Sequence, residues 1–89
     1  MTIYNKISGG KLVGIKITIE KDKIVSFQLV GDFFLYPEDK ITALEKVVLY
    51  STKHTVKKRL TDCITKEHIV LFGVKKDDIV TLIYQAYET

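Results

Sequence analysis

The sequence has few of the residues that cross-link a fold or bend its backbone, and it has no long apolar run that could span a membrane. Among its 89 residues there are one cysteine, one proline and no tryptophan. A single cysteine cannot form an intramolecular disulfide, which favours a reducing setting. The longest uncharged runs, 24–31 and 79–87, fall far short of the ~20 residues that cross a bilayer. The first residues also lack a signal-peptide pattern. We therefore expect a cytoplasmic protein with no membrane partner.

The motifs of common enzyme classes are missing as well. The chain has no glycine-rich phosphate loop, no His-Glu-x-x-His and no Gly-x-Ser-x-Gly. Cys63, His54 and His68 are single residues, whereas zinc sites show paired ligands close in sequence. We expect no catalytic residue, no metal site and no cofactor bound by this chain alone.

What the sequence does contain is enough apolar residue for one small core. With 46% hydrophobic and 28% charged residues, the chain is expected to fold as a single domain over residues 1–89. The net charge is +3. One segment accounts for the excess: Lys53, Lys57, Lys58 and Arg59 contribute +4, so the other 85 residues sum to −1.

The first third of the sequence shows the period of β-strands. Between residues 11 and 20, apolar Val13, Ile15 and Ile17 alternate with polar residues, and the alternation resumes over 25–29. The polar residues 21–23 between them predict a hairpin turn. Residues 2–7 are a weaker strand candidate, joined to the first strand through Ser8, Gly9 and Gly10.

After Gly31 the apolar period becomes helical. Pro37, Glu38 and Asp39 suit a first helical turn, and residues 41–48 carry an apolar stripe. Further helices are predicted near 55–64 and from about residue 76, where Lys75 and Lys76 offer no side-chain N-cap, so that the last helix starts later or frays. The apolar run near Ile69–Phe72 predicts either a short extra strand or a connector.

Strands followed by helices indicate an α+β fold. We expect a three-stranded antiparallel sheet followed by about three helices packed on one of its faces.

The basic segment has two interpretations. On a helix, Lys53 and Lys57 are one turn apart, and Lys58 and Arg59 extend the same charged surface. The surface is either a solvated helix face or a patch for an acidic partner. Aromatic residues are not interleaved with these cations, so a nucleic-acid partner is poorly supported.

The least ordinary stretch lies between the strands and the helices. Three aromatic residues, Phe33, Phe34 and Tyr36, follow Gly31 and Asp32 within what the pattern predicts to be a loop. Rings at consecutive loop positions cannot all point inward, so at least one is expected to face solvent and favour partner binding. Asp32 would cap the loop or meet a cation of the partner.

This stretch also carries a resemblance. The pattern Lys-x-x-x-Phe-x-Leu-x-Gly-Asp-Phe-Phe-x-Tyr-Pro-Glu, from Lys23 to Glu38, resembles the C-terminal accessory domain of lipoate–protein ligases. It is most similar to the form made as a separate small protein. The likeness continues through Ile41, Leu44 and Glu45 and returns at Phe72-Gly73-Val74 and Asp77-Asp78-Ile79-Val80.

The resemblance implies a non-catalytic subunit of a two-subunit ligase. In that family a catalytic subunit binds lipoate, ATP and magnesium, makes lipoyl-AMP and transfers the lipoyl group to a lysine of an acceptor protein. The small subunit is needed for adenylation. Its partner would be the catalytic subunit, in a heterodimer, and lipoyl-acceptor proteins indirectly. Gly31, Asp32, Phe33, Phe34 and Tyr36 are the expected contact residues, with Phe33 and Phe34 as apolar anchors.

Two other function classes stay open. The family's fold is similar to that of sulfur-transfer and iron–sulfur scaffold proteins, which would use Cys63. Against that, Cys63 shares a predicted helix face with Val56 and Leu60, where a thiol behaves as a small hydrophobe. A nucleic-acid-binding protein is the third possibility, and it would show a steeply salt-dependent affinity.

Overall fold

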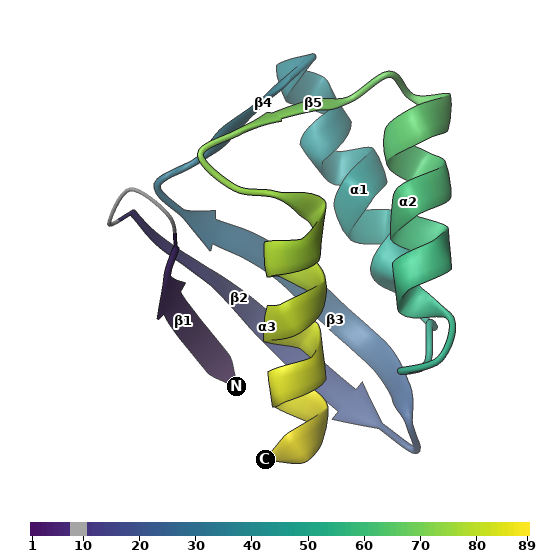
Figure 1. Ribbon diagram of the computed structural model, residues 1–89. Coiled ribbons are helices and arrows are strands. Elements are labelled where there is room, and N and C mark those ends of the chain that lie inside the picture. Colours follow the sequence, from purple (N-terminus) through teal and green to yellow (C-terminus); the bar gives the residue numbers. More distant parts are fainter. Residues whose placement is uncertain (8–10) are drawn as a thin grey trace.

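A computed structural model describes residues 1–7 and 11–89, so the expected joint at Ser8, Gly9 and Gly10 lies outside the described residues. In chain order the elements are β1 (Thr2–Lys6), β2 (Leu12–Glu20), β3 (Lys23–Gly31), β4 (Phe34–Tyr36), the 3-10 turn η1 (Glu38–Lys40), α1 (Ile41–Val48), α2 (Val56–Lys66), β5 (Val70–Phe72) and α3 (Lys76–Glu88). Figure 1 shows this order by colour.

The predicted sheet is confirmed. β1, β2 and β3 form an antiparallel sheet in that spatial order. Val13, Ile15 and Ile17 of β2 are buried, as their alternation requires. Lys21 and Asp22 join β2 to β3 with φ of 50° and 68°, the conformation of a two-residue turn that matches strand twist.

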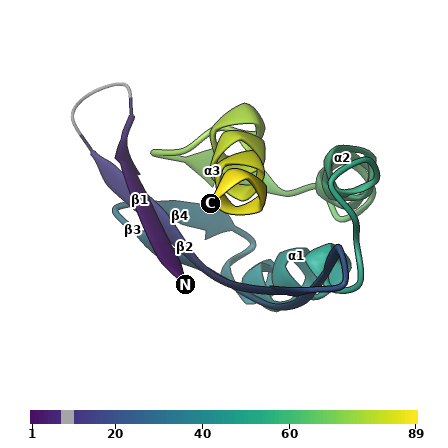
Figure 2. The same cartoon turned by 90° about the horizontal axis from the view of Figure 1, so that it is seen from below.

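The α+β class is also confirmed, and the helices take three different places. α3 lies across one face of the sheet, α1 runs beside β3, and α2 packs on α1 and α3 (Figure 2). Among residues 1–7 and 11–89, no helix covers the sheet's other face, where polar residues such as Lys16 and Gln28 are exposed.

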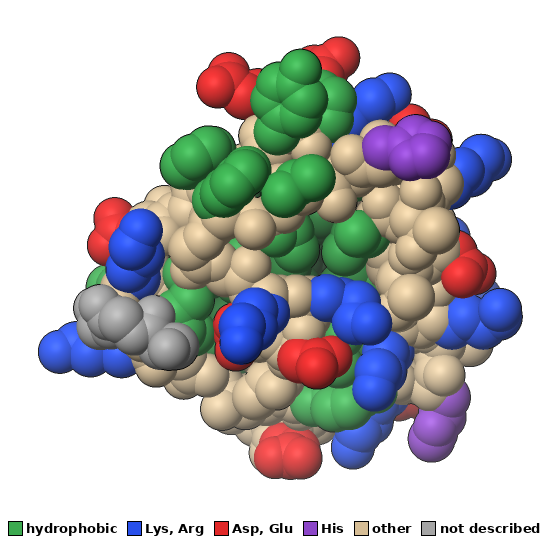
Figure 3. Space-filling view, turned by 45° about the horizontal axis from the view of Figure 1, so that its top comes forward, with side chains coloured by type: hydrophobic (Ala, Val, Ile, Leu, Met, Phe, Trp, Pro, Cys, Tyr) green, Lys and Arg blue, Asp and Glu red, His purple; other side chains and the backbone are tan. Residues whose placement is uncertain are grey.

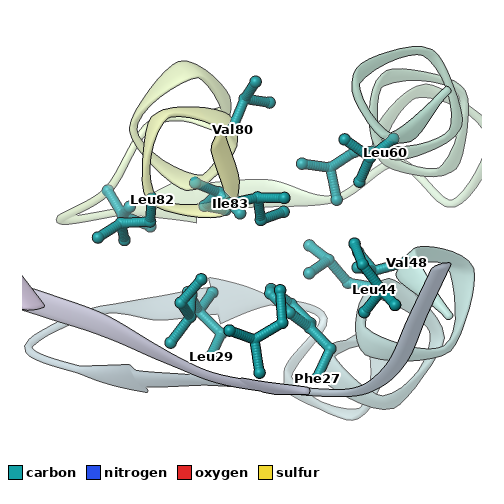
Figure 4. Packing of buried hydrophobic residues seen from close by; sticks show 14 of the residues in the cluster. Phe27, Leu29, Leu44, Val48, Leu60, Val80, Leu82 and Ile83 are labelled. Carbon is teal, nitrogen blue, oxygen red and sulfur yellow. The ribbon is translucent and has the colours of Figure 1, made fainter. Parts of the chain in front are cut away.

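One hydrophobic cluster joins these layers. Figure 4 shows Phe27 and Leu29 of β3 pointing toward Leu82 and Ile83 of α3, with Leu44 and Val48 of α1 facing Leu60 of α2. Sheet and helices thus share a single core.

Two helix starts differ from the expectation. Pro37 precedes the 3-10 turn η1 instead of opening an α-helix, and α1 begins at Ile41. α3 does begin at Lys76, without the predicted delay, because the Asp78 carboxylate accepts a hydrogen bond from the Lys75 N–H at 2.9 Å. Asp78 sits at the third helical position, so its carboxylate satisfies the backbone N–H of the residue before the helix, which is one half of a capping box.

Candidate functional site

The stretch predicted to be an aromatic loop is in part a strand. Phe34–Tyr36 forms β4, which pairs antiparallel with β5, the short strand that the sequence left as an alternative to a connector. The pairs are Phe34 with Phe72, Leu35 with Leu71, and Tyr36 with Val70. The result is a two-stranded ribbon separate from the main sheet.

Strand alternation sorts the side chains of this ribbon onto two faces. Leu35 is only 3% exposed and belongs to the core, with Leu71 packed against it. On the opposite face Phe34 is 60%, Tyr36 67%, Val70 49% and Phe72 43% exposed. We call these four residues the ribbon face. Figure 3 shows hydrophobic side chains gathered at this end of the molecule.

The ribbon face is ordered by an aromatic pair. The rings of Phe34 and Phe72 stack with centroids 4.7 Å apart and planes 17° from parallel. Rings held by a stack and by a strand pair lose little conformational freedom when a partner covers them. Exposed aromatic residues of this kind are typical of the centres of protein interfaces.

Two glycines place the ribbon against the main sheet. Gly31 has φ +119°, and a Cβ there would lie 2.8 Å from the Cα of Val13. Gly73 has φ +83°, and its Cβ would lie 2.8 Å from the carbonyl oxygen of Asp32. Both positions require glycine, because an added side chain would meet backbone on the facing segment.

The predicted contact residues divide into three groups. Phe34 and Tyr36 face solvent, so the expectation that at least one ring points outward holds. Phe33 is partly buried against the core, which makes it a poor surface anchor. Gly31 and Asp32 form the turn before β4, and the Asp32 N–H donates to the Leu12 carbonyl at 2.8 Å. Val70 and Phe72 complete the exposed face but were not among the contact residues predicted from the sequence.

The residues of the basic segment have different surroundings. Lys53 precedes α2 instead of lying on it, a correction to the one-turn spacing with Lys57, and its ammonium lies 5.8 Å from the Tyr84 ring centroid. Lys58 pairs with Asp62 at 3.5 Å. Arg59 donates to the Leu49 carbonyl at 3.2 Å, at the end of α1.

Cys63 lies on the floor of a groove between α1 and α2. The groove has a volume of about 430 Å³ and includes Ala43, Val47 and Arg59 in its lining. Burial raises the pKa of the Cys63 thiol, which disfavours the reactive thiolate. This environment suits a packing residue better than a nucleophile.

Glu67, which lines this groove, forms an ion pair with Lys40. Lys40 donates to Glu67 at 2.9 Å, linking η1 to the residue after α2. The hydrogen bond and the charge of Lys40 lower the pKa of Glu67, and Glu67 raises the pKa of Lys40 in turn. Both groups therefore stay charged over a wide pH range.

Residues 1–7 and 11–89 show neither a metal cluster nor a membrane-spanning helix. This part of the chain holds no group of three or more His, Cys, Asp or Glu side chains arranged to bind a metal. Its longest helix, α3, has 13 residues, and none of its helices combines the length and hydrophobicity of a membrane span.

Among solved structures, the chain is similar to one from Thermoplasma acidophilum. That structure describes an archaeal lipoylation system, comprising a bipartite lipoate protein ligase and its E2 lipoyl domain. The superposition has a TM-score of 0.74 at 21% identity and covers 92% of this chain and 96% of the other. At this identity the likeness shows the fold. No family model matches the sequence, and no curated protein matches it.

Proposed function

We propose that this chain is the non-catalytic accessory subunit of a two-subunit lipoate–protein ligase. It binds the catalytic subunit as a heterodimer in the cytoplasm and enables the ATP-dependent conversion of lipoate to lipoyl-AMP. Lipoate, ATP and magnesium are held by the catalytic subunit. Lipoyl-acceptor proteins are indirect partners, reached through the assembled ligase.

The observation that carries this proposal is the extent of the structural likeness. It spans 92% of this chain and 96% of a chain from a lipoylation system. The two chains therefore match as whole folds and not through one shared motif. The Lys23–Glu38 pattern supports the same assignment, because it resembles the accessory domain at the level of the sequence.

The ribbon face is the proposed contact with the catalytic subunit, near its lipoate and ATP site. Its four exposed apolar residues lie together on one strand pair, and Glu38 and Asp39 come soon after Tyr36, beyond Pro37. Acidic side chains are visible beside the hydrophobic cluster in Figure 3. A complementary surface would be apolar with a cationic rim at the Tyr36 end.

Docking of the catalytic subunit on the ribbon face would shift that subunit toward the arrangement that is competent for adenylation. A subunit without catalytic groups can promote adenylation only if it binds one arrangement of the catalytic subunit more tightly than another. The stacked Phe34–Phe72 pair provides a fixed surface on which such a difference in contact can depend. Loops of the catalytic subunit around the lipoate site are the elements that this contact would order.

A second candidate follows from the same likeness, since the neighbouring system includes a lipoyl domain. In that function the chain itself would receive a lipoyl group on a lysine. Lys21 and Lys23 are exposed at the β2–β3 turn, where a modifying enzyme could reach them. The accessory role is preferred because the Lys23–Glu38 pattern resembles the accessory domain.

One assay distinguishes the two functions. Lipoate-dependent pyrophosphate release is measured with the source organism's catalytic subunit, with and without this chain, and the chain's intact mass is recorded afterwards. Release that requires the chain, with the chain's mass unchanged, is the expected result. A chain that gains one lipoyl group without stimulating release is the acceptor. Equal release with no complex formed and no mass change overturns both.

A further inference from the structure

The two edges of the main sheet differ in whether their outward backbone groups have hydrogen-bond partners. The β3 edge is covered: Ile24 donates to the Ser51 carbonyl at 3.0 Å and accepts from the Tyr50 N–H at 2.6 Å. Further along β3, the Leu29 N–H donates to the Glu45 carboxylate at 2.9 Å. The start of this edge is thus occupied by the segment after α1, and its later part by a side chain of α1.

The β1 edge is open. Ile17 donates to the Met1 carbonyl and Ile7 to the Lys11 carbonyl, both at 2.9 Å, so the odd-numbered residues of β1 direct their backbone groups toward β2. The N–H and C=O groups of Thr2, Tyr4 and Lys6 consequently point away from the sheet. No described residue hydrogen-bonds to these outward groups.

β1 has few of the features that usually block an edge strand. It contains no proline, its pairing with β2 has no bulge, and Lys6 is its one charged residue. The Tyr4 ring folds back over Gly14 of β2, where a Cβ would lie 2.7 Å from the ring's Cε1. The largest side chain of the strand therefore covers its own sheet and leaves the edge accessible.

We propose that two copies of this chain pair antiparallel through β1 and form a continuous six-stranded sheet. Centring the pair on Tyr4 sets Tyr4 opposite the second copy's Tyr4 and Thr2 opposite its Lys6. Each copy has three outward N–H groups and three outward C=O groups, so the two copies together can make six hydrogen bonds. This inference is independent of the ligase assignment.

A second copy fits this edge for two reasons. The register places no like charges opposite each other, and it brings Met1, which is 60% exposed, beside the second copy's Ile7 on the core face. Pairing is also self-limiting. The β3 edge is blocked at Ile24 by residues 50–51 and at Leu29 by Glu45, so a third copy cannot pair along that strand and a two-fold dimer does not grow into a filament.

The test measures the dimer dissociation constant of the isolated chain by sedimentation over a concentration series. Lys6→Pro removes an outward N–H from each copy, and the dimer should weaken by about 30-fold. Lys6→Ala is the matched control, since it removes the same side chain but keeps the N–H, and it should bind as the unaltered chain does.

A second pair of variants should move the constant in opposite directions. Thr2→Lys faces the second copy's Lys6 and should weaken the dimer about fivefold, whereas Thr2→Glu should strengthen it about fivefold. Thr2 also lies opposite Lys16 within the sheet, so unfolding is measured in parallel for both variants.

The outcomes that overturn self-pairing are distinct from failure of the ligase assignment. A chain that stays monomeric at every concentration overturns it, as does a dimer that responds to none of these substitutions. If the chain is monomeric and Lys6→Pro weakens binding of the catalytic subunit, a strand of that subunit occupies the edge instead. Pyrophosphate release with the catalytic subunit reports on the ligase assignment separately.

Discussion

The ribbon face and the basic segment show opposite effects of folding on a sequence cluster. Three aromatic residues near Gly31 were separated by folding, yet two of them joined Val70 and Phe72 to form a single exposed surface. Three of the four cations between residues 53 and 59 contact different groups, namely Asp62, the Leu49 carbonyl and the Tyr84 ring. A strand pair gathers alternate residues on one face, whereas a helix turns successive residues by about 100°. Apolar residues on short paired strands can thus form one continuous surface, whereas consecutive charged residues on a helix spread around it.

The largest effect on stability is expected from replacing Gly31, the glycine that connects β3 to the β4–β5 ribbon. Gly31→Ala should destabilise the fold by about 3 kcal/mol, because an alanine at φ +119° is strained and its Cβ meets β2. Thermal unfolding measures the loss. Asp32→Ala, next to it and exposed, is the control and should change stability by less than about 0.5 kcal/mol. Equal melting temperatures for both variants would show that the ribbon does not depend on this contact.

The next effect tests the ribbon face as a binding surface. Phe34→Ala together with Phe72→Ala should weaken the complex with the catalytic subunit by about 30-fold, or about 2 kcal/mol, while unfolding changes by only about 1 kcal/mol. Titration calorimetry measures the affinity. These positions replace the Phe33 and Phe34 pair that the sequence suggested, since truncating Phe33 would also disturb the core.

The matched control removes an exposed ring elsewhere. Tyr50 is 66% exposed and has φ +64°, which asparagine tolerates, so Tyr50→Asn deletes an aromatic surface without new strain. It should leave affinity unchanged. If both variants bind like the unaltered chain, the ribbon face is not the contact and the docking surface must be sought on another face.

A smaller effect separates the members of the basic segment. Arg59→Ala should cost about 1–2 kcal/mol of stability, because it removes a charged donor from the Leu49 carbonyl at the end of α1. Lys57→Ala should change unfolding by less than about 0.5 kcal/mol, since the Lys57 side chain contacts no described acid. Chemical denaturation compares the two.

Lys57 then becomes the sharper probe for an acidic partner. Lys57→Glu should slow lipoyl transfer to an acidic acceptor at low salt and match the unaltered chain at high salt, where such attraction is screened. If the transfer rate depends on neither the substitution nor the salt concentration, the basic segment is a solvated surface and does not bind an acidic partner.

Elements held by contacts between residues close in sequence were predicted, whereas those held by contacts between distant residues were not. The β2–β3 hairpin and the helices follow from periods within a dozen residues, and they were predicted with small errors at their ends. β4 and β5 have three residues each and exist only because segments far apart in the chain meet. A strand that short carries no periodic signal of its own, so half of the ribbon face was missed. Contacts such as Glu45 with Leu29 and Arg59 with Leu49 depend on tertiary placement in the same way.

Cys63 tests whether the groove between α1 and α2 has any chemistry. Cys63→Ala should keep full stimulation of pyrophosphate release and cost about 1 kcal/mol of stability, because a buried thiol with a raised pKa acts as packing. Activity and unfolding are measured on the same preparation. Loss of function with the fold intact would revive the sulfur-transfer interpretation, and the aromatic ribbon would lose its place as the preferred site.

The smallest effect on stability is expected from the ion pair between Lys40 and Glu67. Lys40 holds the pKa of Glu67 below its usual value, so the pair's contribution is present above the pKa of an unfolded glutamate, near roughly pH 4, and is lost as pH falls through the lower folded value. The pKa of Lys40 is raised, so its contribution is lost only as pH rises past the ordinary lysine range. Melting temperatures of the unaltered chain and Glu67→Gln should therefore differ slightly at neutral pH and converge in acid. Both side chains are partly exposed, so salt should shrink the difference. A gap that persists in acid would show that Glu67 acts through packing and not through its charge.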